Sequence, residues 1–161
     1  MSGASANGDG GARHARVAII GAGFSGIGMA IRLLDDGVDD FYVLERADDL
    51  GGTWRDNTYP GCQCDIPSAL YSFSFAPNPD WSRLYPLQSE IREYLRRIAD
   101  ERGVVPHIRF GHAVTGAAWD DDARRWRIET SHGELTADVL VGAMGGLTEP
   151  KLPDVPERSW S

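Results

Sequence analysis

Hydrophobic residues follow the patterns of a β-strand, an amphipathic α-helix and a second β-strand in the first part of the chain. Residues 17–20 form a continuous apolar run ending at Gly21, which is typical of a strand buried on both faces. Residues 24–36 place apolar side chains at the i, i+3, i+4 and i+7 spacing of a helix: Ile27, Ala30, Ile31 and Leu34. Gly37 suits the C-cap of this helix, and a second strand is predicted over 41–45. This order predicts a βαβ unit with parallel strands.

A long segment without periodicity separates this unit from the next helix. Residues 46–88 hold many of the Pro and Tyr residues, so we expect irregular coil with short helical turns. Loops of this length are usually functional. Regular structure is predicted to resume at Ser89 as N-cap and to end at Gly103, followed by a short strand near Ile108. The apolar stripe of this helix consists of Ile91, Tyr94, Leu95 and Ile98.

The remaining pattern predicts an antiparallel β-meander. Apolar and polar residues alternate over 114–119 and 126–130 and again from Leu135, with turn residues between these stretches. The last strand continues into the apolar run 139–141, which we expect to be buried and to rejoin the parallel sheet. The fold class is therefore α/β: a Rossmann-like βαβ unit with a parallel sheet, plus an antiparallel β-meander.

The predicted domain organisation is one globular unit between two extended ends. We expect residues 1–14 to be a flexible tail because they are rich in Gly, Ala and Ser. The domain covers 15–150 and includes the long loop 46–88. Three prolines favour an extended exit over 151–161, with Pro150 just before it and Pro153 and Pro156 within it.

Composition excludes several classes of partner and cofactor. The 161 residues include 24 acidic and 16 basic side chains, a net charge of -8, which repels nucleic acid and anionic lipid. The cysteines, Cys62 and Cys64, are too close for an ordinary disulfide, and no further ligands complete a zinc site. The chain has no signal-peptide pattern and no apolar run long enough to span a membrane. We therefore expect a cytoplasmic protein without a bound metal.

The first candidate site is the glycine-rich turn between the first strand and the helix. Gly21, Gly23 and Gly26, with Phe24 and Ser25 between them, have the spacing of a dinucleotide-binding turn. The first glycine permits a tight turn, the second lets a pyrophosphate approach the backbone, and the third lets the helix pack closely on the strand. The pyrophosphate then lies at the positive end of the helix dipole.

Glu45 supplies the second part of this pattern. It ends the second strand 19 positions after Gly26, where a carboxylate can accept hydrogen bonds from both ribose hydroxyls of an adenosine. Its negative charge would repel a 2′-phosphate, so the site favours FAD or NAD over NADP. The alternative, a surface glutamate that merely closes a strand, leaves the neighbouring glycine turn unexplained.

The loop that follows carries a more specific resemblance. Its residues are Gly51-Gly52-Thr53-Trp54, Asn57, Tyr59-Pro60-Gly61, Cys64-Asp65, Ser68, Tyr71-Ser72-Phe73-Ser74-Phe75, Trp81 and Gln88-Ser89-Glu90-Ile91. In this order they resemble the type I Baeyer–Villiger monooxygenases. The resemblance implies an enzyme in which NADPH reduces FAD, and O2 then converts a ketone to an ester or lactone. It also implies an incomplete two-dinucleotide-binding fold, with the NADPH domain absent from this chain.

The resemblance assigns roles to particular residues. Gly21, Gly23 and Gly26 would hold the FAD pyrophosphate, and Glu45 would hold the ribose. Phe24, Ser25 and Arg46 would also contact the cofactor. Gly52, Thr53, Trp54 and Tyr71 would lie towards the flavin, and the backbone near Val114 would contact the adenine. Asp65 is the implied catalytic residue, because in the family this aspartate orients a distant arginine near the flavin.

Simpler roles are open for some of these residues. Trp54 could pack inside the loop without touching a cofactor, and Asp65 could cap a helical turn near Ile66-Pro67. Cys64 is expected to be a buried, unreactive thiol. Met144 stands where the family usually has Thr or Ser, which puts a hydroxyl contact there in doubt.

Three functions are compatible with the sequence. The chain could be the FAD-binding N-terminal part of a Baeyer–Villiger monooxygenase, truncated and inactive alone. It could be a non-catalytic fragment of that fold. It could also be an NAD(P)H-dependent oxidoreductase or a flavin monooxygenase that oxygenates nitrogen or sulfur.

Overall fold

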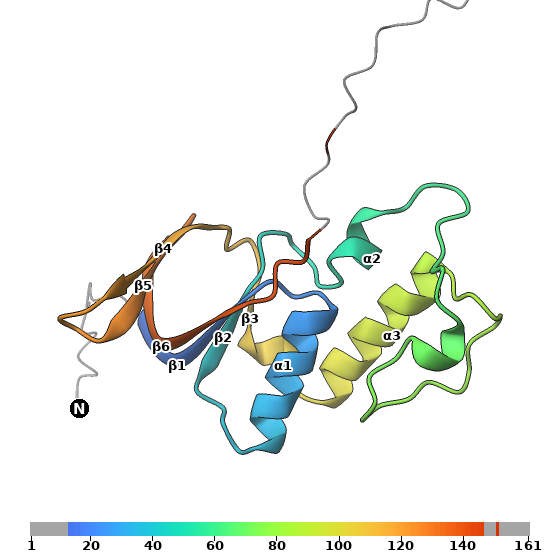
Figure 1. The fold of residues 1–161 in the computed structure, drawn as a ribbon, viewed down its shortest axis with the longest axis horizontal. Helices are drawn as coiled ribbons and strands as arrows, with labels where there is room; N and C mark the ends of the chain where they lie inside the picture. Colours follow the sequence, from blue (N-terminus) through green and yellow to red (C-terminus); the bar gives the residue numbers. More distant parts are fainter. Residues whose placement is uncertain (1–12, 147–150, 152–161) are drawn as a thin grey trace, which may run out of the picture.

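The computed structural model describes residues 13–146 and residue 151, and within them it contains one six-stranded sheet. The first elements are β1 (Arg13–Ile20), α1 (Phe24–Asp35) and β2 (Phe41–Leu44). The two strands are parallel, with Val17 opposite Phe41, so the predicted βαβ unit is confirmed. Figure 1 shows α1 beside these strands.

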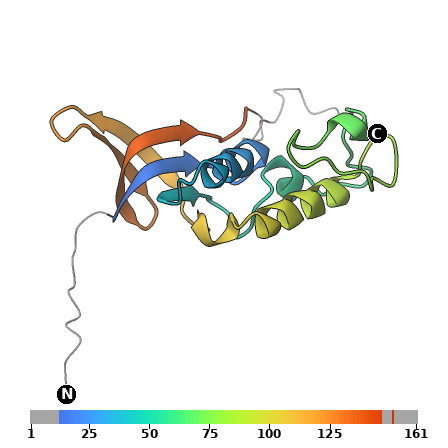
Figure 2. The same ribbon diagram turned by 90° about the horizontal axis from the view of Figure 1, so that it is seen from below.

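The loop and the second helix follow the predicted order. The elements are α2 (Thr53–Asp56), a 3₁₀ turn η1 (Ser68–Leu70), α3 (Gln88–Glu101) and a second 3₁₀ turn η2 (Val105–His107). Thus the long loop contains only two short helical turns. In Figures 1 and 2, α3 lies beside α1, on the same side of the sheet.

The remaining strands form the short parallel edge and the meander. They are β3 (Ile108–Arg109), β4 (Val114–Asp120), β5 (Arg125–Thr130) and β6 (Gly133–Gly142). The order across the sheet is β3-β2-β1-β6-β5-β4. β6 joins the two parts, because it pairs antiparallel with β5 and parallel with β1. The meander and its return to the parallel sheet are therefore confirmed.

The main core lies between the parallel strands and the two long helices. Successive residues of β1 point to opposite faces, as the strand period requires. Ile19 belongs to the core under α1 and α3, whereas Ala18 packs on the other face with Leu44 and Ile128. All four of these side chains are at most 2% exposed. The prediction of a strand buried on both faces is confirmed.

Three local predictions were wrong. β1 begins at Arg13, inside the expected tail, because the long strand β6 offers a partner as far as Leu135. Ser89 is not the N-cap of α3. The N-cap is Leu87, whose backbone N–H donates to the Glu90 carboxylate at 3.1 Å. Val139 is 50% exposed rather than buried, since no described helix covers that part of β6.

The ends of the chain lie mostly outside the described residues. The predicted exit over 151–161 is described only at Lys151, and the first twelve residues of the expected tail are not described. Within the described residues, no helix is both long and apolar enough to cross a membrane.

Gly26 of α1 packs closely on Gly21, which directly follows β1. A Cβ built there would stand 1.8 Å from the carbonyl oxygen of Gly21. We therefore expect Gly26→Ala to lower the free energy of unfolding by about 2 kcal/mol or more, because the backbone must shift. Urea denaturation followed by circular dichroism measures this. Gly146→Ala is the matched control, since no atom of the described residues lies within 4 Å of its built Cβ. Equal stability of both variants would contradict the close-packing role of Gly26.

Candidate functional site

A cavity opens at the carboxyl ends of β1, β2 and β6. Its volume is about 610 Å³, and its walls come from the glycine turn, the end of β2, the α2 segment, residues 112–114 and the end of β6. Ligands of open α/β sheets bind outside the carboxyl ends of the strands. The cavity is therefore the candidate functional site.

The glycines of the turn have different physical roles. Gly21 has φ +101°, and a Cβ there would stand 2.7 Å from the carbonyl oxygen of Ala143, so this position needs glycine for the protein's own packing. Gly23 does not, because the nearest atom to its built Cβ is the Gly52 Cα at 3.8 Å, an ordinary contact. Gly23 lines the cavity, so its missing side chain leaves room for a ligand.

The N-terminus of α1 opens into the same cavity. Gly23 is the N-cap without a side-chain hydrogen bond, and the first turn contains no acidic residue. Within the described part of the chain, the backbone N–H groups of Phe24 and Ser25 have no hydrogen-bond partner, and both residues line the cavity. Free N–H groups at the positive end of a helix dipole suit an anion such as a pyrophosphate.

Glu45 lies directly after β2 and is only 4% exposed. Its Oε2 accepts the backbone N–H of Ala22 at 2.8 Å, and its Oε1 accepts the backbone N–H of Ala47 at 2.9 Å. The carboxylate therefore connects the glycine turn to the loop after β2. It also lines the cavity, where the sequence predicted a ribose-binding acid.

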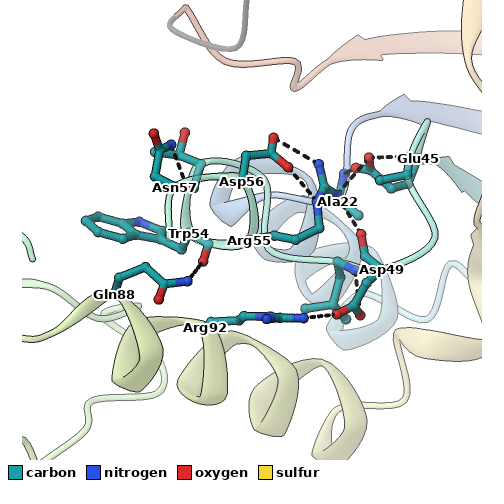
Figure 3. Close-up of polar contacts among 12 residues, drawn as sticks. Ala22, Glu45, Asp49, Trp54, Arg55, Asp56, Asn57, Gln88 and Arg92 are labelled. Atoms are coloured by element: carbon teal, nitrogen blue, oxygen red, sulfur yellow. Dashed lines mark hydrogen bonds and ion pairs between the residues drawn. The ribbon is translucent and has the colours of Figure 1, made fainter. Parts of the chain in front are cut away.

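Arg55 on α2 compensates the charge of Glu45. Its Nη1 donates to Glu45 Oε1 at 3.0 Å and to the carbonyl oxygen of Asp49 at 2.6 Å. Its Nε and Nη2 donate to the two carboxylate oxygens of Asp56 at 2.8 Å and 3.1 Å. Burial favours a lower pKa for Arg55, but these bonds and the charges of Asp56 and Glu45 outweigh burial and raise the pKa. Figure 3 shows the guanidinium between the two carboxylates.

Helix α3 holds the α2 segment in place. Arg92 donates to the carboxylate of Asp49 at 2.8 Å, and Arg96 pairs with the same oxygen. Gln88 donates to the carbonyl oxygen of Trp54. Figure 3 shows Gln88 and Arg92 reaching from α3 towards this segment. Thus the residues around the cavity are fixed by a helix that does not itself line it.

An aromatic group forms another wall. The Trp54 indole N–H donates to the Tyr71 hydroxyl at 3.0 Å, and the two rings meet edge to face at 5.6 Å. Phe24 packs on Tyr71 at 5.2 Å. Burial raises the pKa of Tyr71, with smaller opposing and reinforcing effects from Trp54 and from nearby Cys64 and Asp65. All three residues line the cavity, which suits a planar ligand.

Most of the predicted cofactor-binding residues meet at this cavity. Those lining it are Gly21, Gly23, Phe24, Ser25, Glu45, Arg46, Gly52, Thr53, Trp54, Tyr71 and Val114. Gly26 lies behind the wall, where it packs against Gly21. Their contacts with a cofactor stay predictions, since the geometry shows only that they surround one space.

Asp65 is the second predicted site residue, after Gly26, that lies outside the cavity wall. It is exposed and does not line the cavity. The alternative of a helix cap was wrong, because η1 has Pro67 at its N-cap and no side-chain cap. Cys64 is 3% exposed and its Sγ accepts the N–H of Ile66 at 3.4 Å, in agreement with a buried thiol. The catalytic role of Asp65 stays a prediction.

Sequence reasoning missed Arg55, Asp56 and His112 as lining residues. Arg55 directly follows the Gly51-Gly52-Thr53-Trp54 motif, which was the one available signal. Its contact with Glu45 spans ten residues and depends on how the loop folds back. His112 follows β3, and its backbone N–H donates to the carbonyl oxygen of Glu45 at 2.8 Å. No periodic pattern marks either contact.

Comparisons with known proteins agree with this geometry. Residues 19–86 match the family described as NAD(P)-binding Rossmann-like domain. A Baeyer–Villiger monooxygenase from Streptomyces coelicolor is 59% identical over 143 residues, which are 89% of this chain and 28% of that protein. The chain is a homologue of part of the Baeyer–Villiger monooxygenases.

Solved structures extend this relationship to the fold. The closed crystal structure of cyclohexanone monooxygenase matches with a TM-score of 0.85 and 35% identity, over 91% of this chain and 28% of that one. A structure titled as the OTEMO complex with FAD and NADP matches with a TM-score of 0.81 and 32% identity, over 89% of this chain and 28% of that one. The chain therefore spans a little more than a quarter of the length of each of these three proteins.

The Asp49 ion pairs predict a pH-dependent contribution to stability. Burial favours a higher pKa for Asp49, but hydrogen bonds from Arg92 and Leu50 and the charges of Arg96 and Arg92 outweigh it and lower the pKa below 3.8. A lowered pKa stabilises the fold above the unfolded-state value, and this stabilisation disappears as the pH falls through the folded-state value. Asp49→Asn should therefore cost about 1–2 kcal/mol at pH 7 and progressively less below about pH 4.

Urea unfolding at a series of pH values measures this difference. Asp121→Asn, in the turn between β4 and β5, is the control and should not change stability with this pH dependence. A destabilisation by Asp49→Asn that stays constant down to pH 2 would contradict the role of the Asp49 charge.

Proposed function

We propose that this chain binds FAD in the cavity, with the pyrophosphate at the N-terminus of α1 and the adenosine ribose at Glu45. The observation that carries the proposal is Gly23. It lines the cavity beside free helix N–H groups, and the protein's own packing does not require a glycine there. A backbone free of side chain at this point lets a pyrophosphate approach closely.

The aromatic side of the cavity accounts for the other half of the cofactor. Trp54 and Tyr71 are held rigidly by their hydrogen bond and by Phe24, so they offer a fixed wall for an isoalloxazine ring. Thr53 and Gly52 would contact the same half, and Val114 would contact the adenine. Arg46 would lie next to the ribose together with Glu45.

We further infer that the chain contributes this FAD site to an NADPH- and O2-dependent Baeyer–Villiger monooxygenase acting on a ketone. The support is the 59% identity to a relative of that name, over a quarter of its length. Bound FAD would supply the electron transfer and the activation of O2. The chain's own residues would bind and orient the cofactor and keep water from its aromatic side.

Asp65 is proposed to act near the flavin by orienting an arginine. Its charge is one of the smaller contributions that raise the pKa of Tyr71, a residue that lines the cavity. A carboxylate in this position can fix a guanidinium through paired hydrogen bonds. An arginine for this role would come from a part of the enzyme beyond the described residues.

FAD titration of the purified chain tests the proposed cofactor. We expect saturable binding with a flavin absorbance spectrum, and NADH in place of FAD should bind more weakly. Saturable NADH binding without FAD uptake would contradict the proposal and favour an NAD-dependent oxidoreductase.

Gly23→Ala gives the matched mutational test. We expect it to weaken FAD binding at least about tenfold, which is 1.4 kcal/mol, because the new methyl group blocks the pyrophosphate. Its free energy of unfolding should change by no more than about 1 kcal/mol, since its Cβ meets only an ordinary contact in the protein. Unchanged FAD affinity would contradict the assigned position of the pyrophosphate.

A further inference from the structure

The hydrogen bonds within the protein occupy most of the acceptor positions of Glu45 that a ribose could use. A carboxylate has about four acceptor positions, two on each oxygen. Oε1 uses both of its positions, for the N–H of Ala47 and for Nη1 of Arg55. Oε2 uses one, for the N–H of Ala22. Among the described residues, one acceptor position is left on Oε2, whereas two ribose hydroxyls that both donate to Glu45 would need two.

Among the described residues, Arg55 has an unused hydrogen-bond donor that complements the unused acceptor position of Glu45. A guanidinium carries five N–H donors. Nη1 uses its two for Glu45 and Asp49, Nε uses its one for Asp56, and Nη2 uses one of its two for Asp56. Within the described part of the chain, one N–H of Nη2 has no acceptor. Arg55 lines the same cavity as Glu45.

We propose that Arg55 is a ribose-binding residue of this site. One hydroxyl of the adenosine ribose donates to Oε2 of Glu45, and the other accepts a hydrogen bond from Nη2 of Arg55. This inference rests on the proposed binding of FAD. A hydroxyl both donates and accepts, so one free acceptor and one free donor satisfy a ribose diol.

The number of donors left on Arg55 explains why this arginine does not favour NADP. A guanidinium that receives a 2′-phosphate usually offers two parallel donors. The Nε and Nη2 of Arg55 already donate to Asp56, and a single donor remains among the contacts of the described residues. Glu45, Arg55 and Asp56 together carry a charge of −1 when ionised, which repels a phosphate. Because of its ion pair with Asp56, Arg55 is suited to bind a neutral hydroxyl and not a phosphate.

The test combines Arg55 variants with FAD analogues that lack either the 2′- or the 3′-hydroxyl of the adenosine ribose. In the unaltered chain, each removal should weaken binding about tenfold, as expected for a hydrogen bond to a charged group. In Arg55→Met, FAD itself should bind about tenfold more weakly, and removal of one of the two hydroxyls should have no further effect. Removal of the other hydroxyl should still weaken binding.

Arg55→Lys covers the case in which Arg55→Met fails to fold. Lysine keeps the positive charge beside Glu45, but it has only three donors, and we expect Glu45, Asp49 and Asp56 to occupy them. In this variant too, removal of one of the two hydroxyls should have no further effect on FAD affinity. Its thermal stability should be close to that of the unaltered chain. Arg127→Met is the control, because this exposed arginine pairs with Glu134 on the meander. It should leave all three affinities unchanged.

Two results would overturn the inference alone. Both hydroxyl removals could stay costly in both Arg55 variants, in which case Arg55 does not touch the ribose. Alternatively, neither hydroxyl removal affects the affinity of the Arg55 variants, in which case Arg55 only positions Glu45. Failure of the unaltered chain to bind FAD would instead overturn the proposed function, and this inference with it.

Discussion

The buried carboxylate of Glu45 is the interaction on which the cavity depends. A charge that is only 4% exposed must be compensated, and three donors from separate segments do so: the N–H groups of Ala22 and Ala47 and the guanidinium of Arg55. Because these donors come from the glycine turn, the loop after β2 and α2, one side chain fixes the relative positions of three walls. Its remaining acceptor position is then available to a ligand.

The rigidity of this arrangement continues beyond the cavity. Arg55 also binds the carbonyl oxygen of Asp49, and the Asp49 carboxylate pairs with Arg92 and Arg96 on α3. α3 in turn packs beside α1 over the main core. A continuous path of hydrogen bonds and packed side chains therefore joins the site to the core, and it positions polar groups for a ligand in advance of binding.

Much of the fold could be predicted because its signals are local. The apolar run of β1, the helical stripe of α1 and the alternation of the meander each reflect one element and one period. The errors occurred where a partner decides the outcome. β1 extends to Arg13 because β6 is long enough to pair with it, and Val139 is exposed because no described helix reaches it.

The sequence by itself determined the glycine turn, the acid at the end of β2 and the relationship to a segment of the Baeyer–Villiger monooxygenases. Each of these is a fixed spacing of residue types, and a spacing is visible without coordinates. Only the tertiary structure decided how Glu45 is used, because its partner Arg55 lies ten residues away on a loop that returns to it. Hydrogen-bond capacity is limited, so the question of which donors and acceptors remain for a ligand depends on every contact made in the folded chain.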